Sequence, residues 1–303
     1  MIKMVSSREL VESILRHERG ARVPKGELVL DDKVIAESLD TLSIGFDERY
    51  EFAKSLGLDM IVLSPTYPKD KNSLSIDCSY LDIDKWVNTD LFSFVILDGA
   101  FELGLRVFGF PEYLSMVMSG DEELEEFILE VEKSNKETIA KLSDQGINGI
   151  IVADDIAFQD GLIVRPSIFQ EHFLPTLERQ VKEIENRQMT PFFHSDGYYM
   201  SVMDDIVEAG FKGIHCIDRN CKMNVKDLKS YSEKICLWGH LDINDINASD
   251  DENTIKSIVS EIKDATDFKG FILGTNSGLF PGMDVDKLKN IYDKVDKIVI
   301  RSM

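Results

Sequence analysis

The chain has 303 residues, 43% of them hydrophobic, which is enough to bury one large core or two modest ones. Its formal charge of −21 argues against a nucleic-acid or anionic-membrane surface, because either would need clustered Lys and Arg. No run of about 18 apolar residues occurs and the start lacks the apolar core of a signal peptide, so we expect a cytoplasmic protein.

The four cysteines are few for a chain of this length and form no Cys-x-x-Cys pair. Neither a disulfide framework nor a zinc site built from thiolates is therefore indicated. We expect buried free thiols, because unpaired cysteine is among the most buried residue types.

The first half of the chain alternates between helical periodicity and short apolar runs. Residues 7–19 carry apolar side chains at helical spacing and predict an N-terminal helix. Apolar runs predict strands at 27–31, 59–64, 92–97 and 147–153. Helices are predicted at 47–56 and 121–142, and residues 101–118 are predicted to be helical or mixed. Residues 66–90 are polar and rich in turn formers, which indicates a loop.

The second half repeats the same unit more regularly. Strands are predicted at 190–194, 211–217, 235–239 and 269–274. Helices are predicted at 167–187, 200–209, 225–233, 251–265 and 284–300. A short apolar run that stops at polar residues and is followed by a helix is typical of a parallel α/β sheet.

Eight apolar runs separated by helices or loops predict an α/β protein, a single (β/α)8 TIM barrel. We expect one domain over residues 1–303, in which residues 1–26 contain a helix that precedes the barrel. A doubly wound open sheet is the alternative, but no Gly-x-Gly-x-x-Gly motif follows any strand.

Polar side chains follow most of the predicted strands, and in a barrel they would converge on one mouth. They are Asp98, Asp154, Asp155, His194, Asp196, His215, Asp218, His240, Asp242, Thr275, Asn276 and Ser277. We select His194, Asp196 and Asp155 as candidate catalytic residues. Candidate substrate-binding residues are Asp154, His240, Asn276 and Ser277. The other reading is that these groups hydrogen bond to loop backbone, since a barrel mouth is always polar.

Three kinds of site could use such residues. An imidazole and a carboxylate can act as a general acid–base pair, because burial tunes each toward neutral pH. His194 and Asp196 could bind zinc, with a third ligand from another strand. A polar or anion-binding pocket is the third. Nucleophilic catalysis is the weakest, because no Gly-x-Ser-x-Gly elbow occurs.

Several segments resemble, in order and spacing, the uroporphyrinogen decarboxylase superfamily. They are Pro-Phe-Phe-His-Ser-Asp-Gly at 191–197, Glu-Ala-Gly-Phe at 208–211, Leu-Trp-Gly-His-Leu-Asp at 237–242 and Gly-Thr-Asn-Ser-Gly-Leu-Phe-Pro-Gly-Met-Asp at 274–284. Segments 154–161 and 165–169 look like its methyltransferase-type members. The resemblance covers residues 145–300, is weak over 8–40, and implies a (β/α)8 barrel.

The chain departs from the decarboxylases of that superfamily. Those enzymes carry an arginine-rich N-terminal segment that binds substrate carboxylates and an aspartate after an early strand. Here residues 28–33 read Leu-Val-Leu-Asp-Asp-Lys, and the early strand ends at Ser64. Without those arginines, an acidic chain is poorly suited to a substrate that bears eight carboxylates.

It departs from the corrinoid-linked methyltransferases as well, in which His-x-Cys and a later Cys bind zinc and activate a thiol. The His corresponds to His194, but Asp196 and Ser277 stand at the Cys positions. The resemblance therefore implies either a zinc site with oxygen and nitrogen ligands, His194 and Asp196, or a metal-free site. In the latter, Asp196 or His194 would protonate a leaving oxygen or nitrogen.

The resemblance thus implies a cytoplasmic methyltransferase that moves a methyl group between a small methylated substrate and a corrinoid (cobalamin) on a separate protein. Its mouth would accept the corrinoid face, and contacts to that corrinoid protein or within a homodimer are expected. Two alternatives stay open: a decarboxylase of a smaller substrate, and a non-catalytic corrinoid- or tetrapyrrole-binding protein.

Overall fold

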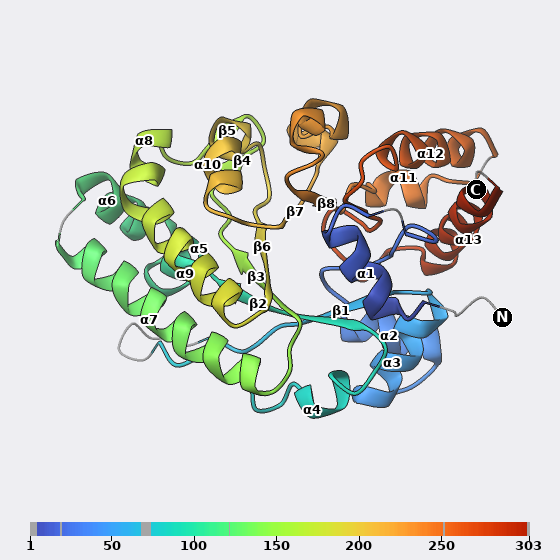
Figure 1. Cartoon of the computed structure of the whole chain (residues 1–303), viewed down its shortest axis with the longest axis horizontal. Coiled ribbons are helices and arrows are strands. Elements are labelled where there is room, and N and C mark those ends of the chain that lie inside the picture. Colours follow the sequence, from blue (N-terminus) through green and yellow to red (C-terminus); the bar gives the residue numbers. More distant parts are fainter. Residues whose placement is uncertain (1–4, 19, 68–73, 121, 251, 302–303) are drawn as a thin grey trace.

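The computed structural model describes residues 5–18, 20–67, 74–120, 122–250 and 252–301, and its centre is a curled parallel sheet (Figure 1). Seven strands follow one another around this sheet in chain order. They are β1 (Met60–Leu63), β2 (Phe92–Asp98), β3 (Gly149–Ala153), β6 (Thr190–His194), β7 (Gly213–His215), β8 (Cys236–Trp238) and β9 (Phe271–Ile272). Each corresponds to one of the predicted strands from 59–64 onward.

The gap between β9 and β1 is bridged by residues 24–31. Lys25 forms a parallel bridge with Leu273, and Leu30 forms another with Leu279. On the other side, the Asp59 backbone N–H donates to the carbonyl of Lys25 at 2.8 Å. This segment therefore takes the place of an eighth strand, and the predicted (β/α)8 fold is confirmed. The predicted strand 27–31 itself survives only as isolated bridges.

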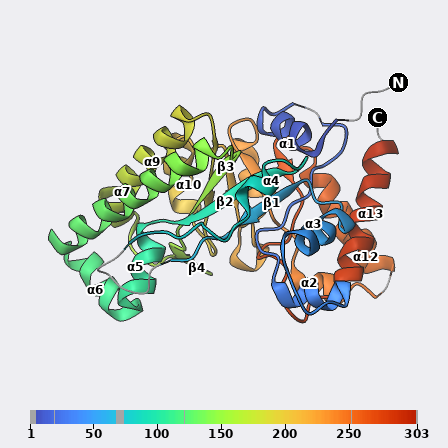
Figure 2. The same ribbon diagram turned by 90° about the horizontal axis from the view of Figure 1, so that it is seen from below.

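Helices cover the outside of the sheet, with α7 and α9 on one side and α12 and α13 on the other (Figure 2). The helices are α1 (Ser7–Leu15), α2 (Asp32–Leu39), α3 (Phe46–Ser55), α4 (Ile83–Trp86), α5 (Ala100–Phe108), α6 (Phe110–Ser119), α7 (Glu122–Asp144), α8 (Pro166–Ile168), α9 (Leu174–Asn186), α10 (Met203–Glu208), α11 (Ile243–Asn247), α12 (Glu252–Ala265) and α13 (Val285–Arg301). A small hairpin, β4 (Ala157–Phe158) with β5 (Gly161–Leu162), follows β3. Within the described residues, no helix is long and apolar enough to cross a membrane.

Two predicted helices are interrupted for identifiable reasons. The predicted helix 101–118 divides into α5 and α6 at Gly109, whose φ of 79° leaves the helical region. The predicted helix 167–187 contains a π-helical turn, η1 (Phe169–Phe173), just before Pro175. Proline has no N–H for the regular helical bond, so the widened turn accommodates it. The helix predicted at 225–233 is a 3-10 segment, η4 (Val225–Tyr231), and α2 was not predicted.

Helix α1 closes the N-terminal end of the barrel. Its Val11 and Ile14 join the inner core, which also contains Leu28, Met60, Phe92, Phe94, Ile151, Phe192, Cys236, Trp238 and Ile272. The Arg8 backbone N–H donates to the Asp90 carbonyl, and the Arg8 guanidinium donates to the carbonyls of Val87 and Thr89, just before β2. One end of the barrel is therefore sealed, and the opposite mouth is left for ligands.

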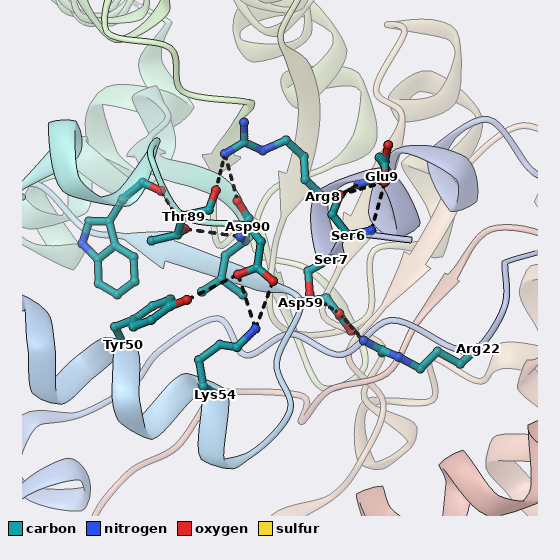
Figure 3. A network of polar contacts seen from close by, with 12 residues as sticks. Ser6, Ser7, Arg8, Glu9, Arg22, Tyr50, Lys54, Asp59, Thr89 and Asp90 are labelled. Atoms are coloured by element: carbon teal, nitrogen blue, oxygen red, sulfur yellow. Dashed lines mark hydrogen bonds and ion pairs between the residues drawn. The ribbon is translucent and has the colours of Figure 1, made fainter. Parts of the chain in front are cut away.

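Asp59, directly before β1, joins three parts of this sealed end (Figure 3). Its fully buried carboxylate accepts from both Arg22 terminal nitrogens at 2.5 and 2.6 Å, from Ser7 Oγ at 2.7 Å and from the Lys25 backbone N–H at 2.9 Å. One side chain thus connects α1, the bridging segment and β1.

We expect Asp59→Ala to lower the free energy of unfolding by about 3–5 kcal/mol, because it leaves a half-buried guanidinium and buried donors without their acceptor. Urea unfolding followed by circular dichroism measures the change.

Lys54→Ala is the matched control. Lys54 pairs with Asp90 at 3.1 Å in the same region, but both side chains are about two-fifths exposed (Figure 3). Exposed pairs contribute roughly 0–1 kcal/mol, so Lys54→Ala should have little effect. Equal losses for the two variants would contradict the role given to Asp59.

Candidate functional site

Asp155, His194 and Asp196 meet at the mouth of the barrel. His194 ends β6 and pairs with Ala153 at the end of β3, so the register brings Asp155 beside the imidazole. One ligand atom from each of the three side chains lies within 4.8 Å of the other two. His194 Nε2 is 3.7 Å from Asp155 Oδ1, and that same oxygen accepts the Asp196 backbone N–H at 2.8 Å. The three residues predicted to be catalytic are therefore neighbours.

The three differ in exposure in a way that suits a reactive site. His194 is 8% exposed, whereas the Asp155 side chain is 41% exposed and Asp196 is open to solvent. The imidazole is thus held by the protein while the carboxylates reach the mouth. Within the described part of the chain, this is the one group of three His, Cys, Asp or Glu side chains placed to hold a metal ion.

His215, at the end of β7, packs directly against His194. The β6–β7 register sets the two histidines opposite each other, and their Nδ1 atoms are 2.9 Å apart. His215 is completely buried, and burial, followed by the neighbouring imidazole, lowers its pKa well below the usual value. It is therefore neutral. The sequence placed His215 at the mouth, but nothing in it singled this residue out for a role.

Two more acidic side chains, Asp98 and Glu102, act on Asp155 electrostatically, and only one of them was predicted from the sequence. Glu102, on α5, has its pKa raised to about 7 by burial and then by the charges of Asp155 and Asp98. Arg106 opposes these charges: its Nε donates to Asp98 at 2.6 Å and its terminal nitrogen to Glu102 at 3.1 Å. Asp98 was placed at the mouth from sequence, whereas Glu102 and Arg106 lie within a helix and gave no such signal.

Asp154 faces the start of α5. Its Oδ1 accepts the Glu102 backbone N–H at 2.9 Å, and an added Cβ at Gly99 would lie 2.1 Å from its Oδ2. Asp154 is 1% exposed, and burial raises its pKa well above the usual value. Through these contacts Asp154 anchors the start of α5. The role of Asp154 in substrate binding stays a prediction.

His240 points into a separate cavity of about 710 Å³ whose lining contains none of the three central residues. Arg219, Glu261 and Phe268 are among the residues around it. Both ring nitrogens are buried and have no hydrogen-bond partner among the residues that the structure describes. Burial, and secondarily Arg219, lowers the pKa of His240 to about 4. The structure therefore does not bring His240 together with His194, and its predicted role in substrate binding stays a prediction.

The segment after β9 carries the last predicted residues. Asn276 and Ser277 are half-buried, and the Asn276 backbone N–H donates to the Leu241 carbonyl at 3.0 Å. Their side chains make no contact with His194 among the described hydrogen bonds, so their substrate-binding role also stays a prediction. Their neighbour Thr275 is fully buried and accepts a hydrogen bond from His215.

One imidazole nitrogen and two carboxylates form a ligand set that suits zinc, which accepts nitrogen and oxygen ligands at about 2 Å in a tetrahedral arrangement. Two ionised carboxylates would also balance a divalent charge. Without a metal, the same groups can transfer protons.

We expect Glu102→Gln to stabilise the protein above neutral pH. A carboxyl group whose pKa is raised from 4.5 to about 7 in the folded state costs no stability below about pH 4.5, a growing amount between pH 4.5 and 7, and the full amount above pH 7. Removing the charge should therefore raise the free energy of unfolding by roughly 1–3 kcal/mol at pH 8, an advantage that disappears at pH 4.

Urea unfolding at both pH values measures this difference, with Glu112→Gln on the exposed side of α6 as the control. A gain for Glu102→Gln that is the same at both pH values would show that its charge is not responsible.

Comparison with known proteins agrees with this description of the barrel and its mouth. Residues 87–298 match the family model described as Uroporphyrinogen decarboxylase (URO-D). No curated protein matches the chain in sequence.

Similar solved structures include a methyltransferase from Methanosarcina mazei, with a TM-score of 0.74, 14% identity and coverage of 97% of this chain and 99% of that one. A putative vitamin-B12 independent methionine synthase from Listeria monocytogenes has a TM-score of 0.54, 15% identity and coverage of 92% and 95%. An L-ribulose 3-epimerase has a TM-score of 0.51, 11% identity and coverage of 86% and 91%. At these identities the likeness concerns the fold alone. The family match spans more than half of the chain, and the protein therefore belongs to the uroporphyrinogen decarboxylase family.

Proposed function

We propose that the protein is a methyltransferase that moves a methyl group between a small methylated substrate and a corrinoid carried by a separate protein. The observation that carries this proposal is the meeting of His194, Asp155 and Asp196 at the open mouth of the barrel. Family membership and the fold shared with the Methanosarcina mazei methyltransferase support it.

The charge of the mouth argues against porphyrinogen decarboxylation. Asp98, Glu102, Asp155 and Asp196 act on one another electrostatically, and Arg106 is the cation that opposes them. A substrate that bears many carboxylates would be repelled by this surface. The same charges disfavour any polycarboxylate substrate and favour a neutral or cationic methyl donor.

Thiol activation by a thiolate-bound zinc is disfavoured as well. By the resemblance to the corrinoid-linked methyltransferases, Asp196 and Ser277 stand at the positions of their two cysteine ligands. The Cys216 thiol hydrogen bonds to Asp196, but burial raises the pKa of this thiol well above its usual value, so it is not a ready thiolate ligand. Cys221 and Cys236 are buried free thiols that do not belong to the three-residue group around His194. The chemistry therefore relies on nitrogen and oxygen groups.

His194, Asp196 and Asp155 are the residues that would hold zinc. A bound zinc ion supplies Lewis acidity, which polarises a substrate oxygen or nitrogen. Asp155 also holds the Asp196 backbone in place through the 2.8 Å hydrogen bond, so it orients the site with or without a metal. The open mouth beside these residues is where the corrinoid face would approach, and the partner or homodimer contacts proposed from sequence would form there.

We expect His194→Ala to lower methyl transfer to added cob(I)alamin by about 10²–10⁴-fold, the usual contribution of one proton-transfer group. The assay follows methylcobalamin formation across methoxyaromatics, methylamines and betaines. His172→Ala is the control variant, because His172 lies on η1 and is not one of the site residues described around His194. Full transfer by His194→Ala would remove His194 from the catalytic assignment, and no transfer by the unaltered protein with any donor would reject the proposed activity.

Metal analysis tests the zinc site separately. We expect about one zinc per chain after purification in zinc-containing buffer, and loss of that zinc in His194→Ala and Asp196→Ala because each removes a ligand. His172→Ala should keep it. Zinc that persists in all the variants, or that the unaltered protein does not retain, would rule out this ligand set.

A further inference from the structure

The hydrogen bonds behind His194 determine which of its ring nitrogens carries the proton. His215 is the starting point. Its Nε2 lies 3.2 Å from the backbone carbonyl of Thr275. A carbonyl oxygen only accepts, so Nε2 of His215 carries a hydrogen. His215 is completely buried and has no carboxylate among its described partners, and an unpaired charge there would be costly. A neutral imidazole has one N–H, which leaves a lone pair on Nδ1.

His194 faces that lone pair. Its Nδ1 lies 2.9 Å from Nδ1 of His215 and 3.2 Å from the backbone carbonyl of His215. Both of these are acceptors, so Nδ1 of His194 carries the hydrogen. Nε2 of His194 therefore has the free lone pair. Its distance of 3.7 Å from Asp155 Oδ1 is longer than a hydrogen bond, which agrees with the absence of a proton between them.

The Thr275 carbonyl, which ends this series of hydrogen bonds, is itself held in place. The Thr275 backbone N–H donates to Glu27 at 3.2 Å, and the Thr275 hydroxyl donates to the same carboxylate at 2.5 Å. Glu27 is 1% exposed, belongs to the bridging segment 24–31, and also accepts the hydroxyl of Tyr292. The orientation of the Thr275 carbonyl is thus set where the barrel closes.

The ring of His215 is also fixed by its surroundings. It packs against Trp238, with ring centroids 4.6 Å apart. An added Cβ at Gly239 would lie 2.5 Å from Cδ2 and Nε2 of His215, so only glycine leaves room for the imidazole. Tight packing of this kind prevents the ring from turning over to exchange its two nitrogens.

We propose that His215, backed by the Thr275 carbonyl, is a positioning residue that holds His194 in the Nδ1–H form with the Nε2 lone pair directed to Asp155 and Asp196. In the resting site His194 is then a metal ligand or a proton acceptor, and any proton given to the substrate comes from another group. This inference rests on the site of the proposed function and specifies what its central residue does.

The tautomer can be read directly by ¹⁵N–¹H correlation spectra of histidine-labelled protein above neutral pH, without substrate or corrinoid. A His194→Gln sample assigns the His194 signals among those of the five histidines. We expect His194 to be protonated at Nδ1 and unprotonated at Nε2. A spectrum of the unaltered protein with the proton on Nε2 overturns the proposal, whatever the variants do.

Two substitutions of similar size separate positioning from packing. His215→Asn keeps an acceptor near Nδ1, whereas His215→Leu removes it and leaves only the backbone carbonyl. We expect His215→Asn to retain the Nδ1–H form and a zinc affinity close to that of the unaltered protein. In His215→Leu the Nδ1–H population should fall, and zinc affinity measured by calorimetry should decrease about ten- to a hundred-fold.

We expect the two variants to differ, so a result in which they behave alike contradicts the proposal. Equal zinc affinity and equal tautomer populations in the Asn and Leu variants would show that His215 only fills space, and equal losses in both would show the same. If His215→Leu does not fold, the spectra of the unaltered protein and of His215→Asn still test the proposal. Methyl transfer is measured separately, so a protein with the expected tautomer but no transfer rejects the proposed function and leaves this inference standing.

Discussion

Closure of the sheet is the constraint on which the rest of the structure depends. Between β9 and β1 the ring is completed only by residues 24–31, which form isolated bridges. Two buried carboxylates hold this segment: Asp59 binds the Lys25 backbone at the sealed end, and Glu27 binds Thr275 toward the mouth. Because a parallel sheet buries both faces, an open gap would expose core side chains and unpaired backbone groups. The convergence of the strand ends therefore depends on a few polar contacts at one seam.

The same closure reaches the site through hydrogen bonds. Glu27 fixes Thr275, Thr275 accepts from His215, and His215 lies against His194. The β6–β7 register sets His194 opposite His215, and the β3–β6 register sets His194 opposite Ala153, two residues before Asp155. The parallel strands thus hold the two histidines directly and place Asp155 in the segment that follows β3, and such support determines whether a site holds useful geometry.

Acidic side chains dominate the charge at the mouth of the barrel. Carboxylates from β2, from α5 and from the segments after β3 and β6 gather beside Arg106, which opposes their charge, and burial together with mutual repulsion raises the pKa of Glu102 to about 7. Such a surface suits a divalent metal or a neutral or cationic substrate and repels polyanions.

The sequence alone determined the seven strands of the main sheet, their order and the family, because hydrophobic runs and the polar residues that end them are local patterns. The same signal placed His194, Asp155 and Asp196 at the mouth. It missed Glu102 and Arg106, which are ordinary helical residues until α5 packs against the strand ends. The sequence also could not distinguish the roles of His215 and His240, because both stand at the ends of apolar runs. The positive φ of Gly239 interrupts the strand alternation, so His240 turns to an outer cavity while His215 meets His194. Only the tertiary structure decided these contacts, because they depend on register and packing between segments far apart in the chain.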